Sequence, residues 1–143
     1  MIVPDVGIHA RGGVDLQRLL RKMKREVKGK AGGITCFVGT VRGSTRGGKK
    51  VRYLHYEAAR NEAIGQLREI ASDAERKKGI LRVMIHHIVD DLKPGEDTIY
   101  LLIASEHRAE AFSILPKLMN RIKKEVFIWK KEVYERGARW VEG

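Results

Sequence analysis

Residues 80–105 read ILRVMIHHIVDDLKPGEDTIYLLIAS, and this stretch decides the fold class. Two strongly β-type segments, 80–89 and 97–105, flank a turn signal at Lys93-Pro94-Gly95-Glu96. We therefore expect two strands joined by that turn. Apolar residues at helical spacing follow over 107–124, so a helix is expected directly after the second strand.

The same patterns extend outward along the chain. Apolar stripes at helical spacing predict two further helices, over 14–28 and 58–77. Short apolar segments bounded by turn residues predict strands over 2–8, 33–42, 51–57, 126–134 and 139–141. The order βα-ββα-ββα-β indicates an α+β fold with three main helices and a largely antiparallel sheet, in a single domain over 1–143.

A glycine-rich basic loop, 43–50 (GSTRGGKK), separates two of the predicted strands. We expect 33–42 and 51–57 to pair as a hairpin with this loop as a long mobile tip. The loop is not a Walker motif, because a strand rather than a helix follows it. Cys36 lies in the first of these strands among apolar neighbours, so we expect it in the core.

The composition narrows the possible partners. The chain has 29 Lys and Arg against 18 Asp and Glu, a formal net charge of +11, which favours polyanions, acidic proteins or phosphorylated small molecules. A single cysteine excludes an internal disulfide and a multi-cysteine metal site. No apolar run is long enough to cross a bilayer, and residues 1–5 lack the features of a signal peptide. We therefore expect a cytoplasmic protein without a membrane partner.

Two basic residues, His107 and Arg108, follow the strand 97–105 at the expected helix start, where Ser105 is a plausible N-cap. The helix dipole disfavours cations there, so their presence indicates a binding site for phosphate or carboxylate. The alternative is that both side chains point into solvent and cost little stability.

Of the two lysines Lys123 and Lys130, the second is the stronger candidate for a catalytic amine. Lys130 follows an apolar run and shares a strand face with Ile128 and Glu132, so its stem is expected to be partly buried. Burial and neighbouring cations lower the pKa of a lysine and make a neutral amine available as base or nucleophile, although pairing with Glu132 opposes this. Lys123 lies near the end of a helix, where a cation is favourable for purely structural reasons.

Two other patterns involve basic or imidazole side chains. Arg42 begins a series of five basic residues around the 43–50 loop, which either clamps a phosphate or forms a solvated tip. His86 and His87 are adjacent on a predicted strand and point to opposite faces, so they cannot easily ligate one metal.

Taken together, these segments resemble the large, catalytic subunit of molybdopterin synthase, the MoaE family. The matching pieces occur in the family's order and cover about residues 33–142: Phe37-Val38-Gly39-Thr40-Val41-Arg42, Tyr53-Leu54-His55-Tyr56-Glu57, Pro94-Gly95-Glu96, Ser105-Glu106-His107-Arg108-Ala109-Glu110-Ala111-Phe112, Ile128-Trp129-Lys130-Lys131-Glu132 and Trp140. Each piece is weak alone, but the ordered set is specific.

The resemblance implies an α/β-hammerhead fold and a sulfurtransferase that needs no cofactor. A homodimer of large subunits would form the centre of a heterotetramer, with a small ubiquitin-like subunit at each end. That subunit's C-terminal Gly-Gly thiocarboxylate would donate two sulfurs to cyclic pyranopterin monophosphate and so form the dithiolene of molybdopterin.

The resemblance also implies roles for individual residues. Arg42, His107 and Arg108 correspond to binders of the substrate's anionic groups, and Lys123 and Lys130 correspond to the catalytic lysines. The other residues that would line the pocket are Thr40, Val41, Lys131 and Glu132.

Two other functions are compatible with the basic composition. One is a basic RNA-binding or anion-binding module without catalysis, although 6% aromatic residues and no stacking motif argue against nucleic acid. The other is an inactive family member that serves only as a scaffold.

Overall fold

The computed structural model describes residues 3–142, in which two four-stranded sheets pack with three helices. The first sheet has the order β1 (Asp5–His9), β4 (Ile80–Ile88), β6 (Asp97–Ser105), β2 (Gly33–Thr40). The second has the order β5 (Asp91–Leu92), β3 (Tyr53–Ala58), β7 (Ile128–Val133), β8 (Ala138–Val141). Every strand pair is antiparallel except β1 with β4. The predicted α+β class is therefore confirmed.

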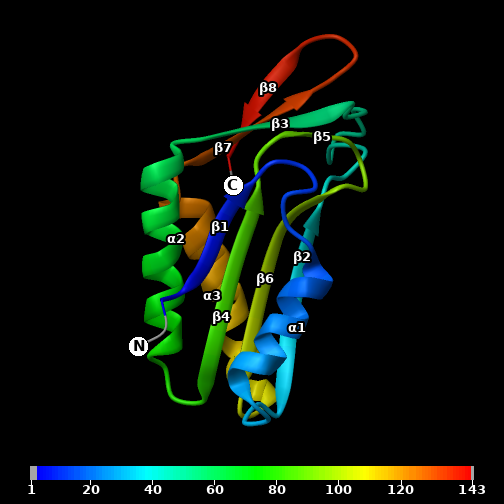
Figure 1. Ribbon diagram of the computed structural model, residues 1–143. Coiled ribbons are helices and arrows are strands. Elements are labelled where there is room, and N and C mark those ends of the chain that lie inside the picture. Colours follow the sequence, from blue (N-terminus) through cyan, green and yellow to red (C-terminus); the bar gives the residue numbers. More distant parts are fainter. Residues whose placement is uncertain (1–2, 143) are drawn as a thin grey trace.

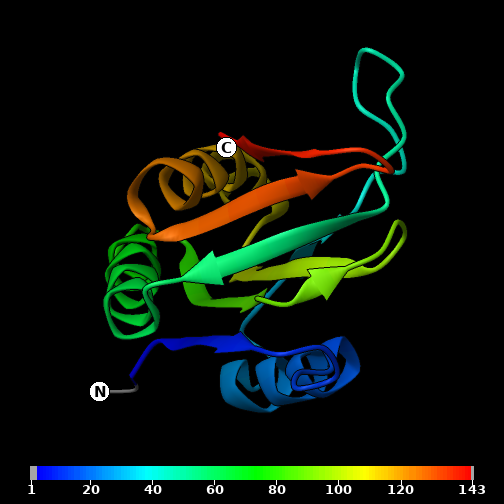
Figure 2. The same ribbon diagram turned by 90° about the horizontal axis from the view of Figure 1, so that it is seen from above.

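The helices cover both faces of the first sheet. Helix α1 (Leu16–Val27) lies on one face, and α2 (Arg60–Glu75) and α3 (Arg108–Glu125) lie on the other (Figure 1). The second sheet crosses one end of this sandwich, over the ends of α2 and α3 (Figures 1 and 2). The carboxyl end of α3 and the start of β7 are therefore brought to the junction of the two sheets.

The two central strands explain why 80–105 is so apolar. Val83 and Ile85 of β4 pack into the core beneath α2 and α3, whereas Met84 packs on the opposite side with Met23 of α1. A strand buried on both faces reads as a continuous apolar run rather than an alternating one. The stretch 80–105 thus forms the centre of the molecule because β4 and β6 pair along their whole length.

Helix α1 confirms the helix predicted over 14–28, and its apolar stripe belongs to the core. Leu19, Met23 and Val27 are buried, while the intervening basic side chains face solvent. The Asp15 side chain caps the first turn by accepting from the Gln17 N–H at 3.2 Å, which satisfies a free donor of the helix start.

The predicted hairpin between 33–42 and 51–57 is wrong. Strand β2 pairs with β6 and lies in the first sheet, whereas β3 pairs with β5 and β7 in the second. The loop 43–50 connects the two sheets and folds back on itself, with Thr45 N–H donating to Lys49 O at 2.8 Å; Figure 2 shows it projecting from the body. Cys36 is exposed rather than in the core, because β2 is an edge strand of its sheet.

Two details of the third helix also differ from expectation. His107, not Ser105, is the N-cap, because Ser105 still pairs in β6 and its hydroxyl donates to His107 O at 2.7 Å. The apolar spacing over 107–124 would place Phe112 and Leu118 on one buried stripe, but Phe112 is 58% exposed, while Leu118 is buried together with Ile114. Pro116 lies inside α3, where it has no N–H for the helix ladder. Ile2, the first residue of the predicted strand 2–8, lies outside the described residues.

Candidate active site

Lys130 occupies the junction between the two sheets. It lies in β7 directly opposite Tyr56 of β3, and its side chain is half-buried. Burial lowers the pKa of the Lys130 amine, and the positive charges of Lys123 and Arg42 lower it further, while Glu132 opposes the shift. The structure thus brings these three cations together from α3, β7 and the segment after β2. The prediction that Lys130 is partly buried is confirmed.

The chain between α3 and β7 fixes the position of Lys123 relative to Lys130. The buried Val126 ends the helix with its N–H bonded to Ile122 O. Phe127 N–H then donates to the Gln66 side chain at 2.8 Å, and Phe127 O accepts from Ala59 N–H at 3.1 Å. Lys123, in the last turn of α3, is exposed and therefore available to a ligand.

Arg42 is held in place through its neighbour Val41. Val41 is buried, its N–H donates to Glu96 O at 3.0 Å, and its carbonyl accepts from Gly95 N–H at 2.9 Å. Gly95 adopts φ +89°, a left-handed conformation that a glycine accepts without strain. The turn before β6 therefore anchors the backbone that carries Arg42.

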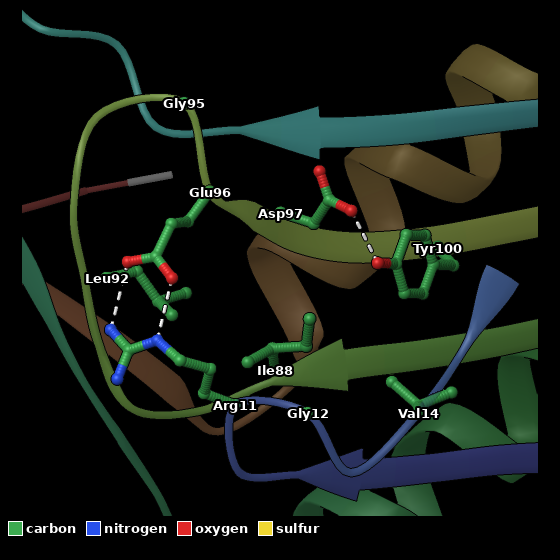
Figure 3. Close-up of a pocket in the computed structure, with 9 residues that line it drawn as sticks. All are labelled: Arg11, Gly12, Val14, Ile88, Leu92, Gly95, Glu96, Asp97 and Tyr100. Carbon is green, nitrogen blue, oxygen red and sulfur yellow. Dashed lines mark hydrogen bonds and ion pairs between the residues drawn. The ribbon is translucent and has the colours of Figure 1, made fainter.

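A bidentate ion pair fixes that turn (Figure 3). Arg11 donates to the two carboxylate oxygens of Glu96 at 2.7 and 2.9 Å, and the Arg11 guanidinium also reaches Asp91 O. These bonds, with Lys93 N–H, lower the pKa of Glu96 to about 2. Figure 3 shows the small open hollow beside this pair. Val14, Ile88 and Leu92 are its apolar side chains, and the Tyr100 hydroxyl in its lining donates to the Asp97 carboxylate.

The remaining predicted pocket residues lie on the two faces of β7 and at the end of β2. Glu132 shares the face of Lys130 and accepts from the Tyr134 hydroxyl at 2.7 Å. Lys131 lies on the opposite face, with its amine 5.2 Å from the centroid of the Trp140 ring. Thr40, at the end of β2, is exposed beside a bulge in the pairing with β6.

His107 and Arg108 lie at the other end of α3 from Lys123. The fifteen-residue separation corresponds to about 22 Å along a helix. His107 caps α3: its N–H donates to the Glu110 carboxylate at 3.1 Å, and its ring nitrogen lies 3.3 Å from the same group. The structure of one chain thus does not bring these two residues to the cations around Lys130.

His86 and His87 point to opposite sides of β4, as predicted. His86 bonds to Asp5 at 2.7 Å and to His9 at 2.8 Å, so both of its ring nitrogens have partners. His87 packs its ring against Tyr56, which is the residue opposite Lys130. No sequence pattern places His87 in the site, because a buried position in an apolar strand accounts for a histidine there equally well.

Neither metal ligation nor membrane insertion is indicated by the described part of the chain. Over residues 3–142, no group of three or more His, Cys, Asp and Glu side chains is placed to hold a metal ion. Over the same range, no helix combines the length and apolar character that a membrane span requires.

The arrangement as a whole is a half-buried amine with a lowered pKa beside two further cations, Lys123 and Arg42. Fixed positive charges of this kind are suited to stabilising negative charge that develops during a reaction.

Comparisons with known proteins identify the family. The family model described as MoaE protein matches residues 11–125. The molybdopterin synthase catalytic subunit of Pyrococcus abyssi is 38% identical over 112 residues, which are 78% of this chain and 75% of that protein. The crystal structure of molybdopterin synthase from Staphylococcus aureus superposes with a TM-score of 0.82 at 26% identity, covering 100% of this chain and 99% of that one.

A second solved structure is a complex. It is described as subunits 1 and 2 of molybdopterin-converting factor from Helicobacter pylori, and its matching chain has a TM-score of 0.74 at 17% identity, with 98% of this chain and 90% of that one covered. At that identity the likeness concerns the fold alone.

The chain belongs to the MoaE family, and it acts as a sulfurtransferase in molybdopterin synthesis. The relatives give no support to the alternative of a non-catalytic RNA-binding or anion-binding module.

Proposed function

We propose that the cations around Lys130 carry the sulfur-transfer chemistry. In this proposal, the C-terminal Gly-Gly thiocarboxylate of a small ubiquitin-like subunit enters between Lys123 and Lys130. Its sulfur attacks cyclic pyranopterin monophosphate and forms a carbon–sulfur bond. Water then cleaves the acyl–sulfur bond, so that the sulfur stays on the pterin and the Gly-Gly terminus leaves as a carboxylate, and a second transfer of the same kind completes the dithiolene. The H. pylori complex of two subunits supports a small-subunit partner.

The observation that carries the proposal is the lowered pKa of Lys130 between two other cations. Attack by a thiocarboxylate sulfur builds negative charge on the pterin side chain, and Arg42 and Lys123 are close enough to stabilise it. Lys130 exchanges the protons, because an amine with a pKa nearer to neutrality does so most efficiently. Lys123 contacts the thiocarboxylate or the substrate.

Single substitutions test these roles. Purified protein is mixed with a thiocarboxylated Gly-Gly partner and the cyclic phosphate precursor, and the dithiolene product is measured. Lys130→Ala and Lys123→Ala are expected to abolish product formation while circular dichroism stays unchanged. Lys124→Ala is the matched control, because Lys124 is exposed on the same helix turn and does not affect the pKa of Lys130. Near-normal turnover in both of the first two variants would remove the mechanism.

His107 and Arg108 enter this proposal through a second copy of the chain. They lie too far from Lys130 to act within one protomer, so we propose that a homodimer places them at the partner's site. The exposure of the His107 side chain, 78%, is compatible with such a contact.

Mixed dimers test that arrangement. His107→Ala and Lys130→Ala proteins, each inactive alone, are mixed and allowed to exchange subunits. If one site needs both protomers, a mixed dimer has one doubly altered site and one intact site, so about a quarter of all sites regain function. No recovery after verified subunit exchange would show that His107 acts within its own protomer or not at all.

A further inference from the structure

The imidazole of His87 lies beneath the strand pair that carries Lys130. Its ring contacts the Tyr56 ring, with centroids 5.2 Å apart and planes at 64°, and the residue is 8% exposed. Tyr56 is paired with Lys130 across β3 and β7. Lys130 is thus the cross-strand neighbour of the residue that His87 contacts, and its charge is one of the causes that lower the pKa of His87.

One hydrogen bond fixes the tautomer of His87. Nδ1 lies 2.9 Å from the carbonyl oxygen of Ile88, and a carbonyl only accepts, so Nδ1 carries the hydrogen. In the neutral ring, Nε2 then has a free lone pair. Within residues 3–142 no side chain or backbone group forms a hydrogen bond to Nε2. Over the same residues, every side-chain nitrogen or oxygen that is fully shielded from solvent has a hydrogen-bond partner. In this part of the chain, Nε2 is therefore an unpaired acceptor that is not completely sealed by the surrounding atoms.

We propose that His87 is a positioning residue for Lys130: the described residues leave Nε2 without a partner, and a rotation of the Lys130 side chain lets its amine donate a hydrogen bond to that lone pair. This inference rests on the proposed function, in which Lys130 exchanges protons. A neutral amine that donates one N–H to a fixed acceptor keeps its lone pair directed toward the reacting groups. His87 takes up no proton itself: Lys130 receives the proton from the substrate and later returns it.

The burial of His87 suits this role. Burial is the largest cause that lowers its pKa, to about 4, so the ring stays neutral near pH 7. A protonated ring would add another cation beside Lys130 and would have no lone pair to offer. A histidine at the surface of the same strand would lack this property.

Two amide substitutions separate the roles of the two ring nitrogens. His87→Asn keeps a donor near the position of Nδ1 for Ile88 O but leaves no acceptor at Nε2, whereas His87→Gln keeps an amide oxygen near Nε2. Both are neutral at every pH. We expect His87→Asn to lower kcat by roughly 10- to 100-fold through misplacement of the amine, with KM unchanged, and His87→Gln to keep most of the activity. Full activity in His87→Asn, or equal losses in two folded variants, would overturn the proposal.

A measurement on the unsubstituted protein does not depend on how the variants fold. In protein labelled with ¹⁵N-histidine, the His87 signals are expected to report a neutral Nδ1–H tautomer at pH 7, and the Nε2 signal is expected to shift in Lys130→Met. An Nε2–H tautomer, or an Nε2 signal that ignores Lys130→Met, would contradict the inference. Failure of the proposed function is distinguishable, because it appears as normal turnover in Lys130→Ala whatever His87 does.

Discussion

Acid is expected to destabilise the protein through His87. Burial lowers the pKa of this ring from its ordinary value of 6.5 to about 4. Between these two pH values, the ring is mostly protonated in the unfolded chain and mostly neutral in the folded chain. Stability from this group is therefore complete above pH 6.5 and is lost as the pH falls toward 4. The difference between a pKa of 6.5 and one of about 4 corresponds to about 3 kcal/mol in full, of which roughly 2–3 kcal/mol is lost by pH 4.5.

The assay is urea unfolding at pH 7.5 and pH 4.5, at one fixed protein concentration because subunit association also contributes. The pKa of His9 is lowered by burial as well, and the pKa of Asp5 is lowered mainly by its bond to His86, so both add to acid sensitivity. The comparison with His87→Gln removes these shared contributions. We expect the unsubstituted protein to lose roughly 2–3 kcal/mol more than this variant between the two pH values. Equal losses would refute the claim that His87 is buried in its neutral form.

Two further predictions concern the framework around the site. Met23→Ala should destabilise the protein by about 2–5 kcal/mol in urea unfolding, because the Met23 side chain of α1 is fully buried, whereas Lys24→Ala at an exposed position of the same helix should change little. Glu96→Ala should speed amide hydrogen exchange at Val41 and Gly95, since it removes the Arg11 ion pair that fixes the turn, while the global unfolding midpoint barely moves. Unchanged exchange at Val41 would show that the turn holds without the ion pair.

The sequence was sufficient where local pattern and tertiary structure agree. Strand alternation after the apolar run at 126–129 placed Lys130 on a half-buried face, and burial with nearby cations does lower its pKa. Lys123 was harder to recognise, because a lysine at a helix end is favourable for the dipole whether or not it is functional. Its proximity to Lys130 depends on the Phe127 contacts to α2, which no local pattern reveals.

The sequence failed where pairing is decided by distant segments. A glycine-rich loop between two β-type segments predicts a hairpin, yet β2 pairs with β6 and β3 pairs with β7, so the two segments separate into different sheets. The helix start shows the same limit. Ser105 has a typical N-cap side chain, but strand pairing retains it in β6 and moves the cap to His107.

His87 was not predicted as part of the site for a different reason. The positioning role proposed for His87 depends on which ring nitrogen bonds to Ile88 O and on the contact with the Tyr56 ring across the junction of the two sheets. Neither fact follows from a histidine in an apolar strand. Strand alternation indicated Lys130 and the resemblance to a known family indicated Lys123, whereas only the three-dimensional arrangement indicates a role for His87.

The most direct test is the pKa of the Lys130 amine, measured by NMR titration with labelled lysine. The account predicts a pKa clearly below the ordinary 10.5, which moves back toward it when Lys123→Met or Arg42→Met removes a neighbouring charge. A Lys130 amine that titrates at its ordinary value, and ignores both substitutions, would contradict the convergence of cations from which the mechanism is derived.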